Sequence, residues 1–116
     1  MAGRKTARSA AQALKDRKKL SNHNTKVVVD EHGHAHMLLF GNRIAVYTAD
    51  NRLFITTAGW DMVTTRARLS EIGGFRLSRS RGTLRLNNND WTGKWTEIVE
   101  AGPVTMFNYN EPPEYL

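Results

Sequence analysis

The chain has 116 residues, of which 40% are hydrophobic and 24% are charged, and its formal net charge is +6. This length suits one globular domain, and the hydrophobic content argues against an intrinsically disordered chain. The sequence contains no cysteine, which excludes a disulfide framework, a cysteine-ligated zinc site and a cysteine nucleophile. We therefore expect a protein of a reducing compartment, with no cofactor, no membrane span and no secretory signal.

The positive charge is unevenly placed along the chain. Residues 1–26 contain eight basic residues and one acidic residue, a net charge of +7, whereas residues 27–116 together carry −1. Residues 97–116 hold four glutamates and no lysine or arginine. We therefore divide the chain into a basic N-terminal arm (1–24), a β-rich core domain (25–100) and an acidic, aromatic C-terminal tail (101–116).

The arm is predicted to contain one helix. Residues 1–8 are small and basic and are expected to be disordered, and Ser9 is a candidate N-cap for a run of good helix formers that reaches Leu20. Large apolar side chains are few in this run, so the helix should be marginal when isolated. We expect it to order on binding a partner.

The core has the alternation of a β-rich domain. Strands are predicted at 26–30, 36–40, 43–48 and 52–57, with turns of glycine, asparagine and aspartate between them. A helix of two to three turns follows, capped by Asp61 or Thr64 and stopped by Gly73. Later strands are predicted around Phe75–Leu77, around Leu84–Leu86 and over Trp91–Val99, with a turn at 87–90.

The predicted fold class is therefore α+β, with six to seven short strands and one packed helix. Two architectures fit this order of elements. One is a twisted, mostly antiparallel sheet with a helix on one face, and the other is a small open barrel.

Four short motifs of the core carry a resemblance: Gly59-Trp60, Thr64-Thr65-Arg66-Ala67-Arg68-Leu69, Gly82-Thr83-Leu84-Arg85-Leu86-Asn87 and Asp90-Trp91-Thr92-Gly93-Lys94-Trp95. Together they resemble a group of small accessory proteins of tailed bacteriophages with no established activity. The likeness covers residues 25–99 and leaves out the arm and the tail. It implies a viral protein of the host bacterial cytoplasm or of the virion, and it carries over no functional residues.

The first functional hypothesis is non-specific binding of nucleic acid, either DNA or RNA. Lysine and arginine at this density neutralise phosphates and release counterions. The candidate contacts are Arg4, Lys5, Arg8, Lys15, Arg17, Lys18 and Lys19 in the arm and Arg66, Arg68, Arg79, Arg81 and Arg85 in the core. Strand alternation separates Arg76 from Arg79 and Arg81. Trp91, Trp95 and Tyr47 are candidate base-stacking residues, although such tryptophans are more typical of a core.

The second hypothesis is a protein-interaction module without enzymatic activity, acting as an inhibitor of a host protein or as a virion or assembly component. Its basis is the opposed charge of arm and tail and the aromatic residues of the tail. The tail could add to the sheet edge of a partner, or arm and tail could pair between subunits of a homo-oligomer. The sequence has no nucleophile elbow and no phosphate loop, so we expect no enzyme.

A metal site is the weakest candidate. His32, His34 and His36 alternate, and on an uninterrupted strand their imidazoles would share one face and could bind zinc, nickel or copper. Gly33 is expected to place a turn within this stretch, which would break the shared face. We therefore predict no metal cofactor.

Overall fold

The computed structural model describes residues 2–22, 24–59 and 63–98, with side chains from residue 7 onward. Within these ranges the chain forms two helices and nine strands, and the predicted α+β class is confirmed. The elements are α1 (Ala2–Asp16), β1 (Leu20–Asn22), β2 (Thr25–Val29), β3 (Ala35–Leu39), β4 (Asn42–Tyr47), β5 (Leu53–Ile55), α2 (Val63–Ile72), β6 (Leu77–Ser80), β7 (Thr83–Leu86), β8 (Asn89–Asp90) and β9 (Thr96–Ile98).

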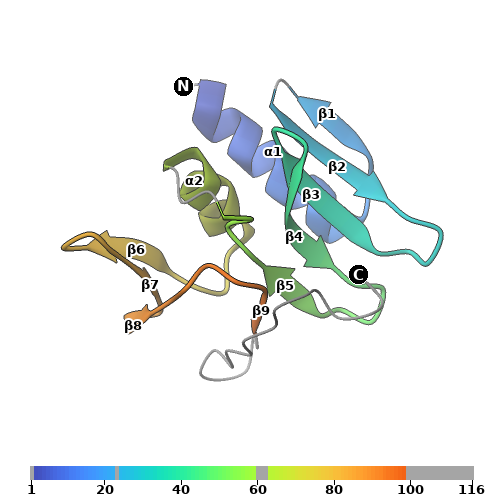
Figure 1. The fold of residues 1–116 in the computed structure, drawn as a ribbon. Coiled ribbons are helices and arrows are strands. Elements are labelled where there is room, and N and C mark those ends of the chain that lie inside the picture. Colours follow the sequence, from blue (N-terminus) through green and yellow to red (C-terminus); the bar gives the residue numbers. More distant parts are fainter. Residues whose placement is uncertain (1, 23, 60–62, 99–116) are drawn as a thin grey trace.

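The strands form two antiparallel sheets rather than a closed barrel. The large sheet has the order β1-β2-β3-β4-β5-β9, and the small sheet has the order β6-β7-β8. The first five strands are therefore a meander, as the four predicted strands and their turns indicated. Strand β9 joins the meander at β5, where Arg52 Nε and Nη2 donate to the two carboxylate oxygens of Glu97 at 2.8 and 2.9 Å. The small sheet extends away from the large one (Figure 1).

Helix α1 is part of the domain core. It lies across one face of the large sheet and packs beside α2 (Figure 1). Ala10 and Leu14 are completely buried and belong to the same apolar cluster as Val27 and Met37 of the sheet. The sequence predicts a basic arm that is separate from the core domain, whereas in the structure α1 packs into the core. Alanines let the helix approach the sheet closely, so a few small apolar side chains are enough to bury one face.

The ends of α1 also differ from the prediction. The helix begins at Ala2 rather than at Ser9, and it ends at Asp16 rather than near Leu20, which instead begins β1. At the end of the helix Arg17 has a φ of 53°. The N–H groups of Arg17 and Lys18 donate to the carbonyls of Leu14 and Ala13 at 3.2 and 2.9 Å. This is the Schellman arrangement, with an arginine in the left-handed position that glycine usually occupies.

Helix α2 has the predicted length and the predicted stop. Its buried residues are Thr65, Arg68, Leu69 and Ile72, and Gly73 follows with a φ of 84°. The proposed cap Asp61 lies outside the described residues. None of the described helices is both long and apolar enough to cross a membrane.

The single strand predicted over Trp91–Val99 is wrong for the described part of that stretch. Strand β8 ends at Asp90, and β9 begins only at Thr96. Between them Trp91 turns into the core, where its Nε1 donates to Thr96 Oγ1 at 2.8 Å, and Gly93 has a φ of 84°. A positive φ is incompatible with an extended strand. The turn predicted over residues 87–90 is also shorter than expected. Only Asn87 and Asn88 have left-handed conformations, and β8 begins at Asn89.

Candidate nucleic-acid interface

Two cations of the N-terminal segment, Arg8 in α1 and Arg17 just after it, contact other parts of the protein. Arg8 lies 3.8 Å from a carboxylate oxygen of Glu71 on α2. Arg17 donates from Nη2 to the carbonyl of Thr48 and to Oδ1 of Asn51, both at 2.7 Å. These contacts tie α1 to α2 and to the turn after β4. Arg8 and Arg17 therefore have structural roles that their sequence positions did not indicate.

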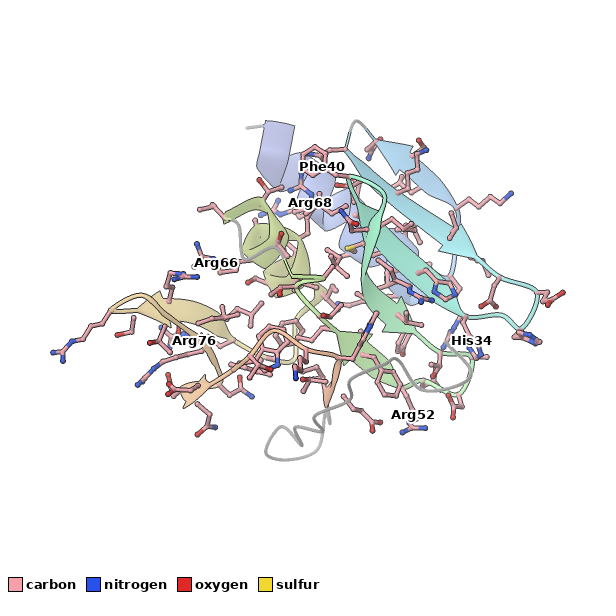
Figure 2. All side chains as sticks on the ribbon, viewed as in Figure 1. His34, Phe40, Arg52, Arg66, Arg68 and Arg76 are labelled. Carbon is pink, nitrogen blue, oxygen red and sulfur yellow. The ribbon has the colours of Figure 1, made fainter. Side chains whose placement is uncertain are left out.

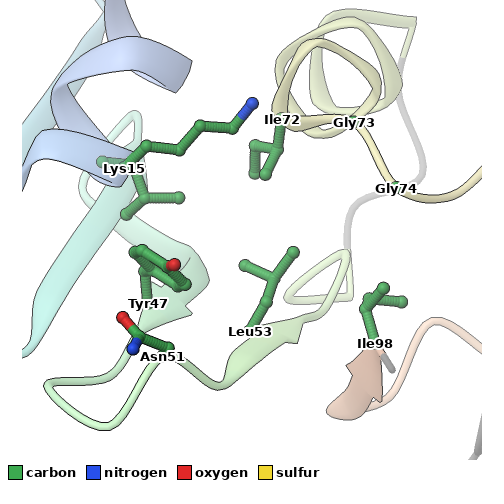
Figure 3. A pocket seen from close by; sticks show the side chains of 9 residues that line it. Lys15, Tyr47, Asn51, Leu53, Ile72, Gly73, Gly74 and Ile98 are labelled. Atoms are coloured by element: carbon green, nitrogen blue, oxygen red, sulfur yellow. The ribbon is translucent and has the colours of Figure 1, made fainter. Parts of the chain in front are cut away.

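Lys15 lies beside a cavity between α1, α2 and the sheet. The cavity has a volume of ≈ 360 Å³ and is lined by Leu14, Lys15, Tyr47, Asn51, Leu53, Ile72, Gly73, Gly74 and Ile98. The side chain of Lys15 extends along it toward Ile72 and Gly73 at the C-terminal end of α2 (Figure 3). A cation at this end of a helix is favoured by the helix dipole.

Lys18 and Lys19 follow the end of α1, and both are exposed. They lie in the short connection to the edge strand β1. Arg4 and Lys5 belong to the first turns of α1, and their side chains lie outside the described part. Arg8 and Lys15 are also exposed, but Arg8 lies near Glu71 and Lys15 extends along the cavity, so among the described side chains of the arm we assign phosphate binding chiefly to Lys18 and Lys19.

Arg68 of α2 is a core residue. Its side chain is 5% exposed, its Nε donates to Thr25 Oγ1 at 2.9 Å, and Nη2 donates to Asn24 Oδ1 at 3.3 Å. Burial lowers the pKa of its guanidinium below the usual value of arginine. Arg68 therefore joins α2 to the start of β2 and is not available to a phosphate. Arg66, on the same helix, is half-buried.

The remaining predicted arginines gather on the β6–β7 hairpin. Residues 73–90 contain four arginines and one carboxylate, that of Asp90. Arg79 and Arg81 are exposed, and so is Arg76 immediately before β6. Arg85 is half-buried, with its Nε 3.5 Å from Asp90 Oδ1. Figure 2 shows Arg76 at the opposite end of the molecule from His34. Of the four arginines that are exposed among the described side chains, three lie on or at the base of this hairpin: Arg76, Arg79 and Arg81.

Strand alternation predicts that Arg76 lies on the other face from Arg79 and Arg81, if the strand begins at Phe75. The strand begins instead at Leu77, and Arg76 stands at the base of the hairpin. Its N–H donates to Asn87 Oδ1 at 2.8 Å, and its carbonyl accepts from the N–H of Asn87 at 2.8 Å. Arg76 thus lies at the base of the hairpin that carries Arg79 and Arg81.

The aromatic residues do not form a base-stacking platform. Trp91 is 7% exposed and lies in the core cluster, which confirms the core interpretation of this residue. Trp95 is half-buried, with the guanidinium of Arg43 5.7 Å from its ring centroid. Tyr47 is half-buried beneath Arg17. Because one ring is buried and the other two lie against arginines, we do not assign base stacking to these three residues.

The histidines are separated by the expected turn. Gly33 has a φ of 81°, and His32 is exposed while His34 and His36 are buried. The Nδ1 of His34 accepts from the N–H of Ala49 at 3.0 Å, and the Nε2 of His36 bonds to Asp30 Oδ2 at 2.7 Å. His36 therefore holds the β2–β3 connection together, and His34 ties that connection to the turn between β4 and β5. Among the residues that the structure describes, no three metal-ligating side chains come close enough to hold an ion.

Asp30 is the centre of this connection. Its Oδ1 accepts from the N–H groups of His32 and His34 at 2.9 and 3.0 Å. Desolvation by itself would raise the pKa of Asp30, but the hydrogen bonds from His36, His34 and His32 prevail and lower it from 3.8 to about 2. The carboxylate thus holds the turn together through His32, His34 and His36.

The fold and its basic surface belong to a small phage protein, as the resemblance implied. The chain matches the model of the Kyanoviridae Gp96 protein over residues 3–103, and it belongs to that family. The match includes α1, whereas the resemblance seen in the sequence began only at residue 25. A comparison with curated proteins and a comparison with solved structures each found no match.

Proposed function

We propose that this phage accessory protein binds nucleic acid without sequence preference and without catalysing a reaction, in the cytoplasm of the bacterial host. The binding groups are chiefly the arginines of the β6–β7 hairpin. The observation that carries the proposal is the composition of that hairpin and its base, where Arg76, Arg79 and Arg81 are exposed and residues 73–89 include no acidic residue. Guanidinium groups gathered in this way bind phosphates and displace condensed cations.

Lys18 and Lys19 add a second, weaker contact. Both are exposed, and both lie beyond the helix end at which Arg17 is held against the sheet. Arg8 and Arg17 contribute less than their sequence positions suggest, because binding a phosphate would compete with Glu71 and with the carbonyl of Thr48. The main contact is therefore expected on the hairpin rather than on the N-terminal segment.

The test compares two variants that remove the same charge from the two surfaces. One carries Arg76→Gln, Arg79→Gln and Arg81→Gln, and the other carries Lys15→Gln, Lys18→Gln and Lys19→Gln. Each lowers the formal net charge from +6 by three. Deleting residues 1–24 would be a poor test, because it removes core residues such as Leu14. Binding to duplex DNA, single-stranded DNA and RNA is measured by fluorescence anisotropy at about 0.1 M salt.

We expect the variant with three arginines replaced to bind at least about tenfold more weakly than the natural chain. The variant with three lysines replaced should bind about threefold more weakly. Equal losses for the two variants would show that only total charge matters. An absence of binding to all three probes by the natural chain would rule out the proposal.

A second candidate function is interaction with a protein of the host or the virion, and Phe40 favours it. Phe40 is 61% exposed at the turn between β3 and β4, and its φ of 51° is one that a bulky residue rarely adopts. An exposed aromatic ring held in this way is typical of an interface anchor. If the natural chain binds no nucleic acid, Phe40→Asn becomes the variant with which to search for loss of a protein partner or of self-association.

A further inference from the structure

We infer that the β6–β7 hairpin enters the major groove of duplex DNA, with Arg81 at its tip. This inference rests on the proposed function and names its substrate as B-form duplex DNA rather than RNA. Three features carry it: the separation of the hairpin from the body, the composition of its tip, and the backbone conformation of its turn.

The hairpin stands apart from the large sheet. Strands β6 and β7 pair from Leu77 opposite Leu86 to Ser80 opposite Thr83, in a sheet that shares no strand with the large one. Figure 1 shows this hairpin projecting from the side of the molecule on which α2 lies. A two-stranded ribbon that projects in this way can reach into a groove while the body stays outside it.

The tip of the hairpin has the composition of a surface that contacts base edges and phosphates. Residues 79–83 are all exposed, and they comprise two arginines, a serine, a glycine and a threonine. The apolar side chains of β7 are buried, Leu84 opposite Arg79 and Leu86 at the base of the hairpin. A tip without apolar or acidic side chains has no role in packing, and its hydroxyl and guanidinium groups are donors that the major groove accepts.

The turn itself is built around an unfavourable residue. Arg81 and Gly82 have φ values of 51° and 80°, which define a two-residue type I′ turn between Ser80 and Thr83. Asparagine is the favoured first residue of such a turn, and a long side chain there costs roughly 1 kcal/mol. Arg79 Nη1 donates to the carbonyl of Gly82 at 2.6 Å and braces this turn. Strain of this kind clusters at functional sites, and in this chain Arg17, Phe40 and Ala58 share the left-handed conformation with Arg81.

The dimensions of the grooves select the substrate. The major groove of B-form DNA is roughly 12 Å wide and admits a two-stranded β-ribbon. The major groove of A-form RNA is deep and too narrow for side chains to read. Arg81 in the DNA groove would lie near guanine N7 and O6, the commonest contact of an arginine with a base edge. The expected result is a preference for duplex DNA over duplex RNA, with guanine N7 shielded where the tip lies in the groove.

The experiment uses the full chain, a duplex DNA and a duplex RNA of the same sequence, and methylation of guanine N7 by dimethyl sulfate as a probe of the major groove. The variant is Arg81→Asn, and Lys19→Asn is the control with the same change of charge at another exposed site. Because asparagine suits the turn, Arg81→Asn should unfold at the same temperature as the natural chain or at a higher one.

We expect the natural chain to bind duplex DNA at least about tenfold more tightly than duplex RNA and to protect guanine N7. Arg81→Asn should lose the protection and about fivefold to tenfold of the DNA affinity, whereas Lys19→Asn should keep the protection. Equal binding of DNA and RNA without N7 protection would overturn the groove inference and leave the proposed function standing. Failure to bind any nucleic acid would overturn both.

Discussion

The guanidinium carbon of Arg17 lies 4.5 Å from the centroid of the Tyr47 ring. This contact joins the end of α1 to β4, and the same guanidinium also reaches Thr48 and Asn51. A residue that the sequence assigns to nucleic acid thus fastens the helix to the sheet. Its charge is used inside the protein, which moves the expected binding surface away from the N-terminal segment.

Substitutions of Arg17 separate its side-chain contacts from its backbone conformation. Arg17→Ala removes the ring contact and two hydrogen bonds while keeping a side chain in the left-handed region, so it should destabilise the fold by roughly 2 kcal/mol. Arg17→Gly loses the same contacts but relieves the backbone, so it should be more stable than Arg17→Ala by about 1 kcal/mol. Urea unfolding measures both, and an alanine variant more stable than the glycine variant would contradict the expected strain.

Arg68 should affect stability and leave binding unchanged. Arg68→Met removes the donor to Thr25 and Asn24 inside the core, and we expect a loss of about 2 to 3 kcal/mol. The exposed Arg76→Met is the control and should change stability by less than about 0.5 kcal/mol. DNA binding should show the reverse order: Arg76→Met should lower the DNA affinity, and Arg68→Met should leave it unchanged. A folded Arg68→Met variant with lowered DNA affinity would show that this arginine reaches the ligand.

Acid should weaken the β2–β3 connection through Asp30. Its pKa of about 2 in the folded chain lies below the ordinary 3.8. The stabilisation that it provides is therefore present above pH 4 and is lost as the pH falls from about 4 toward 2. Asp30→Asn should cost about 1 to 2 kcal/mol near neutral pH, with the difference from the natural chain shrinking over that acid range. Glu31→Gln, at an exposed neighbouring position, is the control, and a difference independent of pH would contradict the assigned role.

Gly93 should tolerate no side chain. A Cβ built on it would meet Thr57 Oγ1 at 2.4 Å, and its carbonyl accepts from Thr56 Oγ1 at 2.6 Å. With the positive φ added to this clash, Gly93→Ala should destabilise the fold by about 3 kcal/mol. Gly41 has a similar φ of 81° and nothing within 4 Å of its Cβ position. Gly41→Ala therefore isolates the backbone cost, about 1 kcal/mol, and equal losses at the two sites would contradict the packing argument.

The sequence was sufficient to predict much of the sheet. Alternating apolar residues and short polar turns correctly indicated the four strands of the meander, because each strand buries one face against the helices. The helix of residues 63–72 was also predicted, since Leu69 and Ile72 recur at helical spacing and Gly73 stops it. The sequence does not predict the break between β8 and β9. This break depends on a tertiary hydrogen bond from the N–H of Thr57 to the carbonyl of Gly93, which no local sequence pattern reveals.

The role of α1 and the partners of the basic residues could not be predicted. An alanine-rich helix with eight cations nearby has the same sequence pattern whether it packs on a sheet or projects into solvent. Only the fold brings Glu71 near Arg8, and Thr25 near Arg68. The basic hairpin could be anticipated in part, because Arg81-Gly82 marks a turn, Arg79 lies just before it, and no acidic residue lies between positions 71 and 90.

The most direct test of nucleic-acid binding through the hairpin is the salt dependence of duplex DNA affinity. Contacts from Arg76, Arg79, Arg81, Lys18 and Lys19 predict a log–log slope of magnitude about 4 to 5, at about 0.9 for each phosphate. The variant with Arg76, Arg79 and Arg81 changed to glutamine should retain a slope of about 2. Such a fall would support the hairpin as the main binding surface. Equal slopes for the natural chain and this variant would contradict it.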